Sequence, residues 1–187
     1  MTLCISTSGP FAIIAIYDQN GLLVTRELRE SNRAASAAIF EMLESLQVGV
    51  PKRIVVDVGP GSFTGVRVGV TIAKMLAHLY DVPLLGVSTF DLVSENPVAI
   101  GSKRGEVYVR IPGSEPVTMA IETAKETPGI VMAEADELAS LYSFLPEHAL
   151  TKADPLSLTP LYVANPSISR AKQSHIMGET FGGRENV

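Results

Sequence analysis

The sequence predicts a mixed α/β fold in two lobes. Three apolar stretches come first, and a strong turn at 18–21 joins the second to the third; helical and strand-like stretches then alternate. The resulting order, βββαβαβ, is that of a ribonuclease-H-like mixed sheet, in which a meander is followed by right-handed crossovers. The expected strands are 3–6, 11–17, 22–28, 54–58 and 83–87, and the expected helices are 31–47, 66–80 and a short one at 89–94.

A smaller α/β second lobe is expected after Asn96-Pro97, where the pattern changes to short strands. We place the first lobe at residues 1–96 and assign 97–187 to the second lobe together with a C-terminal tail. The tail after Pro146 has one apolar stretch at 158–163 and a polar end that we expect to be mobile. The expected elements of the second lobe are strands at 98–100, 106–111, 117–121 and 130–133 and a helix at 134–144.

The most informative stretch runs from Val58 to Gly69 and reads VGPGSFTGVRVG. A buried strand enters it and a helix leaves it, so it forms a strand-to-helix turn. The glycines are expected to take positive φ or to let backbone approach closely, the proline to fix one φ, and a hydroxyl to cap the new helix. These structural roles fall on Gly59, Pro60, Gly61, Ser62, Thr64 and Gly65.

A glycine-rich loop before a helix also suits a phosphate group, but the spacing does not fit the common nucleotide motifs. A P-loop needs Lys and then Ser or Thr after its last glycine, where this chain has Val66 and Arg67. A dinucleotide fingerprint needs G-x-G-x-x-G, which the loop misses by one residue. A tight structural connection is the favoured interpretation, and anion binding is the alternative.

The two longer helices expected in the first lobe are rich in small residues, which let another backbone come close. One interpretation is that they dock against a helix pair of a partner, with two basic residues facing partner carboxylates. The other is that they pack on their own sheet and present a charged side to solvent. The docking interpretation assigns the interface to Arg67, Gly69, Val70, Ala73, Lys74, Ala77, Ala34 and Ala38.

Composition and charge limit the functional classes. The chain has 187 residues, of which 46% are hydrophobic and 19% charged, as is typical of a globular protein. A single cysteine, Cys4, indicates a core thiol and a reducing compartment, and the absence of a spanning stretch or a secretory leader predicts a cytoplasmic location. The net charge of -5 disfavours direct nucleic-acid binding but not an indirect role through a partner.

Several stretches resemble one bacterial family. GPGSFTGVRVG at 59–69, followed by Ala73-Lys74 and by VPLLGVST at 82–89, is similar to the signature of the TsaB proteins, also called YeaZ; RGEVY at 104–108 and TPLYV at 159–163 add weaker likenesses. The resemblance implies the actin-like ATPase fold and a non-catalytic relative of TsaD, the enzyme that attaches threonylcarbamoyl to an adenosine of tRNA. It also implies a heterodimer with TsaD through first-lobe helices, recruitment of the ATPase TsaE, a homodimer in isolation, and only indirect contact with tRNA.

The first turn departs from the family pattern. Relatives usually have Asp-Thr-Ser where this chain has Ser6-Thr7-Ser8, and a neutral hydroxyl is a far weaker magnesium ligand than a carboxylate. Ala35-Ser36 likewise replaces His-Ser, and Gly101-Ser102-Lys103 replaces Asp-Ala-Arg. We therefore expect no catalytic residue, no cofactor and no metal, and a chain that is not an enzyme.

Two functions other than a scaffold are alternatives for this chain. An autonomous ATPase or small-molecule kinase of this fold would use Asp57, the one carboxylate beside the glycine loop; the other interpretation of Asp57 is that it caps backbone amides of the loop. A glycoprotease, a label once attached to the family, would need a metal site. His78, His148 and His175 lack the spacing of such a site.

Overall fold

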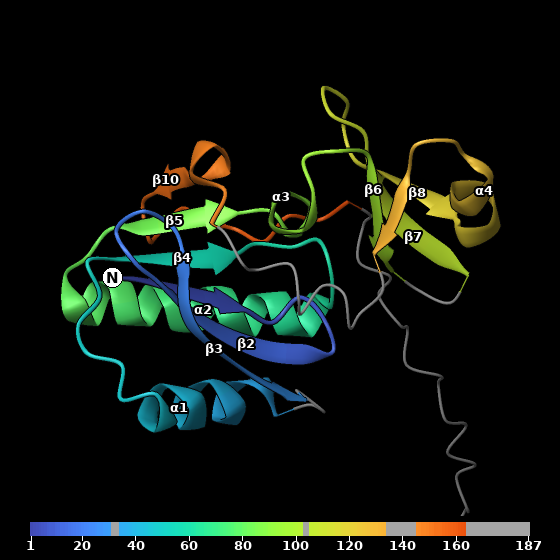
Figure 1. Ribbon diagram of the computed structural model, residues 1–187. Coiled ribbons are helices and arrows are strands. Elements are labelled where there is room, and N and C mark those ends of the chain that lie inside the picture. The colour runs from blue at the N-terminus through green and yellow to red at the C-terminus, as the bar shows by residue number, and fades with distance from the viewer. Residues whose placement is uncertain (31–33, 103–104, 134–144, 164–187) are drawn as a thin grey trace, which may run out of the picture.

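The computed structural model describes residues 1–30, 34–102, 105–133 and 145–163. Its described strands form two sheets, one of six strands in the order β10-β5-β4-β1-β2-β3 and one of four in the order β8-β7-β6-β9 (Figure 1). The strands are β1 (Thr2–Ser6), β2 (Phe11–Tyr17), β3 (Leu23–Glu30), β4 (Arg53–Asp57), β5 (Leu84–Val87), β6 (Val98–Gly101), β7 (Glu106–Arg110), β8 (Val117–Ala120), β9 (Val131–Ala133) and β10 (Thr151–Ala153). The helices are α1 (Ala35–Ser45), α2 (Phe63–Tyr80), α3 (Thr89–Val93), α4 (Ile121–Glu126) and the 3-10 turn η1 (Glu147–Ala149).

The six-stranded sheet confirms the predicted βββαβαβ order. Strands β1, β2 and β3 form an antiparallel meander, while β4 and β5 run parallel to β1. In the register, Ile5 of β1 lies opposite Ile14 of β2 and Val56 of β4. Because β1, β4 and β5 point the same way, their carboxyl ends meet at one edge of the sheet, which is where ligands bind in many folds of this kind.

The two faces of this sheet are buried by different parts of the chain. Helices α1 and α2 lie side by side on one face (Figure 1), where they cover Leu3 and Ile5 of β1. Cys4, between them, points to the other face, as the alternation of a strand requires. Its burial confirms the expected core thiol, and desolvation raises the pKa of that thiol. Among the described helices, none combines the length and apolar character that a membrane crossing requires.

The four-stranded sheet forms the second lobe. One of its faces packs on α4, where Ala124 is buried with Val107 and Val109. The other face packs on α3, where Phe90 meets Val98. The predicted strands of this lobe are found within one or two residues, but helix α4 was not expected. The expected helix at 134–144 and the polar end of the tail fall outside the described residues.

Residues 145–163, here called the return segment, lie in the range given to the second lobe and its tail, and they pack against the first lobe. Leu145 is fully buried with Cys4 in the core of the first lobe, and β10 pairs antiparallel with β5. Leu158 packs against the core of the first lobe. The physical reason is that β5 would otherwise leave an open sheet edge, whose backbone groups need partners.

Truncating Leu145 tests whether the return segment belongs to the first lobe. We expect Leu145→Ala to lower the free energy of unfolding by about 2–5 kcal/mol, because a fully buried leucine loses its contacts and leaves a cavity. Leu156→Ala is the matched control, since Leu156 is 91% exposed on the same segment, and its effect should stay within about 0.5 kcal/mol. Urea denaturation of the full chain measures both, and equal effects would contradict the packing described.

Candidate functional site

The candidate site lies at the carboxyl edge of β1, β4 and β5. Three connections converge there: the turn after β1, the glycine loop after β4, and the start of α3 after β5. The polar side chains at this edge are almost completely buried, with exposed fractions between 0% and 6%. They are Ser6, Thr7, Ser8, Asp57 and Thr89.

Asp57, at the end of β4, is the centre of this cluster and is 0% exposed. Its Oδ2 accepts from Ser6 Oγ at 2.7 Å and from Ser8 Oγ at 2.5 Å. Its Oδ1 accepts from Thr89 Oγ1 at 2.7 Å and from the backbone N of Gly59 at 2.8 Å. Burial raises the pKa of Asp57, and these hydrogen bonds oppose that rise. The bond from Gly59 confirms that Asp57 caps the glycine loop.

The glycines of the loop allow the turn after β1 to lie directly against it. A Cβ atom on Gly65 would lie 2.0 Å from the carbonyl oxygen of Thr7, and one on Gly61 would lie 2.2 Å from that of Ser8. Hydrogen bonds fix the contact: Ser62 N donates to Ser8 O at 2.7 Å, and Thr7 Oγ1 donates to Gly65 O at 2.7 Å. The space beside these two glycines is therefore filled by the chain's own turn. This favours the tight structural connection over anion binding.

The remaining loop residues have structural partners as well. Gly59 has a φ of +95°, which a glycine adopts without strain, and it precedes a cis bond to Pro60. The carbonyl of Pro60 accepts from Thr89 Oγ1 at 2.9 Å. Ser62 is the N-cap of α2, accepting from Gly65 N at 3.2 Å, while Thr64 lies exposed on the first turn.

The small-residue stripe of α2 faces the protein's own sheet, as the packing interpretation expects. Ala73 is 0% exposed and Ala77 2%, and a Cβ on Gly69 would lie 2.3 Å from Thr7 Oγ1. Small side chains let α2 approach the sheet and the turn after β1, so they serve internal packing. The predicted interface residues that are buried within the chain itself are Gly69, Val70, Ala73, Ala77 and Ala38.

Three of the predicted interface residues do reach the surface. Arg67 and Ala34 are exposed, and Lys74 is half-buried. Arg67 lines a shallow groove of about 400 Å³ between α1 and α2, here called the α1–α2 groove. Beyond it, Met75 and Leu79 expose 47% and 69% of their surfaces along α2. The residues that line the groove are Ser36, Thr64, Arg67, Val68, Thr71 and Ile72.

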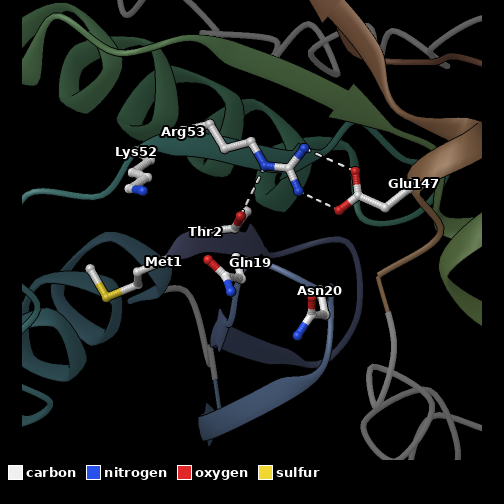
Figure 2. A pocket seen from close by; sticks show the side chains of 7 residues that line it. All are labelled: Met1, Thr2, Gln19, Asn20, Lys52, Arg53 and Glu147. Atoms are coloured by element: carbon white, nitrogen blue, oxygen red, sulfur yellow. Dashed lines mark hydrogen bonds and ion pairs between the residues drawn. The ribbon is translucent and has the colours of Figure 1, made fainter.

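A second cavity, of about 350 Å³, lies beside the N-terminus, where β1 and β4 begin (Figure 2). Its one internal ion pair joins the guanidinium of Arg53 to both carboxylate oxygens of Glu147, and Arg53 Nε also donates to Thr2 Oγ1 at 2.9 Å. Since Arg53 is thus neutralised, it fastens the return segment to β4 rather than attracting an anion. The lining residues are Met1, Thr2, Gln19, Asn20, Lys52, Arg53 and Glu147.

Sequence reasoning singled out the turn Ser6-Thr7-Ser8 but missed Thr89 at the candidate site. Thr89 donates to Asp57, a residue 32 positions away, so no local pattern pointed to that contact. Within the described part of the chain, no group of three or more His, Cys, Asp or Glu side chains is placed to hold a metal ion.

Replacing Gly65 tests the close approach of the turn. We expect Gly65→Ala to lower the free energy of unfolding by at least about 2 kcal/mol, because its Cβ would overlap the backbone of Thr7 and the turn would have to move. Gly9→Ala is the control, since nothing lies within 4 Å of a Cβ there. Chemical denaturation compares the two, and a Gly65→Ala protein as stable as Gly9→Ala would refute the contact.

Asp57 predicts a pH dependence of stability. Because burial raises its pKa above the ordinary 3.8, the folded state holds the proton more tightly than the unfolded state. The resulting stabilisation is fully present below the unfolded-state pKa and is lost as pH rises through the folded-state pKa. We expect the free energy of unfolding of the wild type to fall relative to that of Asp57→Asn as the pH rises from about 3 to 7. Urea titrations at several pH values measure it; a shift in the opposite direction would contradict the raised pKa.

Comparison with known proteins gives the relatives of this chain. The sequence model of the family described as TsaD, tRNA N6-adenosine threonylcarbamoyltransferase, matches residues 21–113. The tRNA threonylcarbamoyladenosine biosynthesis protein TsaB of Bacillus subtilis is 32% identical over 120 residues, which cover 57% of this chain and 52% of that protein. The protein of the same name from Escherichia coli is 42% identical over 60 residues, or 27% of this chain and 26% of that protein. The chain thus spans about half the length of the first of these relatives.

Solved structures share the fold. YeaZ from Pseudomonas aeruginosa superposes with a TM-score of 0.63 at 19% identity, covering 86% of this chain and 98% of that one. At this identity the likeness concerns the fold, which is the ribonuclease-H-like, actin-like ATPase fold. Two further observations point to TsaB. The chain matches the sequences of proteins named TsaB, and its glycine loop is complete from Gly59 to Gly69. Together these findings support a TsaB/YeaZ family assignment for the chain.

Proposed function

We propose that this chain serves tRNA threonylcarbamoyladenosine biosynthesis as a non-catalytic subunit that docks on a TsaD-like transferase. The names of its relatives support the pathway, and the match of the TsaD family model to residues 21–113 supports common ancestry with the transferase. In this proposal the tRNA is bound by the partner, and the complex recruits a TsaE-like ATPase. A net charge of -5 is consistent with indirect contact to tRNA.

The observation that carries the non-catalytic part of the proposal is the closed edge of the sheet. Phosphoryl transfer needs a carboxylate able to hold Mg²⁺ and room for the phosphates beside it. Here Asp57 is 0% exposed and accepts hydrogen bonds from two serines, a threonine and a backbone amide. The turn after β1 fills the space beside Gly61 and Gly65.

The docking part of the proposal uses the outer face of α1 and α2. The α1–α2 groove presents apolar and hydroxyl side chains, with Arg67 at its side and Lys74 further along the helix. These two basic residues form a local positive patch on a chain whose net charge is -5. Such a patch suits a partner that carries carboxylates around an apolar contact. In the absence of that partner, the same face would pair two copies of this chain.

A bulky charge in the groove tests the docking. We expect Thr71→Arg to abolish the one-to-one complex with the TsaD-like protein of the same organism while leaving the melting temperature unchanged, because Thr71 is exposed. Arg67→Glu should weaken the complex, since it reverses the charge offered to the partner. Lys125→Glu, an exposed charge reversal on α4 of the second lobe, is the matched control. Size-exclusion chromatography and calorimetry measure complex formation.

Activity assays complete this test. Threonylcarbamoylation of tRNA by the partner should depend on this chain and fail with Thr71→Arg. A complex that forms equally well with Thr71→Arg would refute the proposed surface. If the purified chain turns over ATP and this turnover disappears in Asp57→Asn, the chain is an autonomous ATPase and the proposal of a scaffold is wrong.

A further inference from the structure

We infer that the docking surface extends beyond the α1–α2 groove onto an aromatic pair, Phe63 of α2 and Tyr162 of the return segment. This inference rests on the proposed function and adds a second patch to the surface described there. The partner would then contact two parts of the chain that are far apart in the sequence. Neither aromatic residue was expected at an interface from the sequence.

The pair is exposed and continuous with the groove. The ring centroids of Phe63 and Tyr162 are 5.4 Å apart, with an angle of 37° between the ring planes. Phe63 exposes 43% of its surface and Tyr162 47%, although both are large and apolar. The guanidinium of Arg67 lies 5.3 Å from the centroid of the Phe63 ring, and Arg67 also lines the groove. One cation thus connects the aromatic pair to the groove.

Tyr162 is held in place before any partner binds. The backbone N of Leu161 donates to the carbonyl of Val58 at 2.7 Å, beside the glycine loop. A Cβ on Gly59 would lie 3.3 Å from the carbonyl oxygen of Leu161, so the two backbones are in close contact. Leu158, four residues before Tyr162, packs into the core of the first lobe. A side chain whose backbone is fixed in this way loses little conformational entropy on binding, which favours affinity.

The chemistry of the pair fits a protein partner better than an RNA strand. Aromatic residues and arginine are enriched at the centres of protein interfaces, where each contributes a large contact area. A stacking platform for RNA bases is normally accompanied by several cations that follow the phosphates. Here Arg67 already lies over Phe63, and the chain carries a net charge of -5. We therefore assign the pair to an apolar side chain of the partner, next to a carboxylate that meets Arg67.

The test compares variants of the return segment. Calorimetry with the TsaD-like partner should show Tyr162→Ala binding roughly tenfold to hundredfold more weakly than the wild type. Tyr162→Phe, which keeps the ring, should bind like the wild type. Leu156→Ala is the control, because Leu156 is 91% exposed on the same segment, and it should leave the affinity within about twofold. Phe63→Leu, which removes the other ring, provides a second variant if Tyr162→Ala fails to fold.

The outcomes separate this inference from the proposed function. If Thr71→Arg abolishes the complex while Tyr162→Ala and Phe63→Leu bind like the wild type, the inference is wrong and the proposed function stands. If the wild type forms no complex, both fail. If Tyr162→Ala weakens only tRNA binding by the complex, and not the affinity between the proteins, the pair contacts RNA and the inference is overturned.

Discussion

The structure depends on one close contact, in which the turn after β1 lies against the start of α2. Gly61 and Gly65 leave room for the backbone of Thr7 and Ser8, and hydrogen bonds in both directions hold it there. This contact fixes the height and rotation of α2 on the sheet. It therefore decides which residues of α2 are buried and which, such as Arg67 and Thr71, remain on the surface for a partner.

The same contact turns a carboxylate into a structural element. An isolated buried carboxylate is costly, and its cost is offset only when donors surround it. Asp57 has such donors from the turn after β1, from its own loop and from the start of α3, so it joins the ends of three neighbouring strands. The carboxylate would thus serve cohesion here, in keeping with the proposed role as a scaffold.

Local patterns predicted most of the fold, and long-range contacts account for what they missed. Alternation and helical periodicity gave βββαβαβ, and the glycine spacing gave the strand-to-helix turn, because both signals lie within a few residues. The stripe of Gly69, Ala73 and Ala77 showed that a backbone comes close but could not show whose backbone it is. Strand β10 has three residues and a partner far back in the chain, so its sequence carries almost no signal. The contact of Tyr162 with Phe63 has the same origin.

The pairing of β10 with β5 makes the first lobe discontinuous along the chain, with the four-stranded sheet inserted between its last two strands. During synthesis, the ribosome must therefore release the whole inserted lobe before the six-stranded sheet can be completed. Until then β5 is an open edge, and Cys4 lacks the cover of Leu145. During this period the nascent chain is exposed to aggregation, which a contiguous lobe would avoid. Early binding of another protein to α1 and α2 would stabilise the part of the first lobe that has already been synthesised.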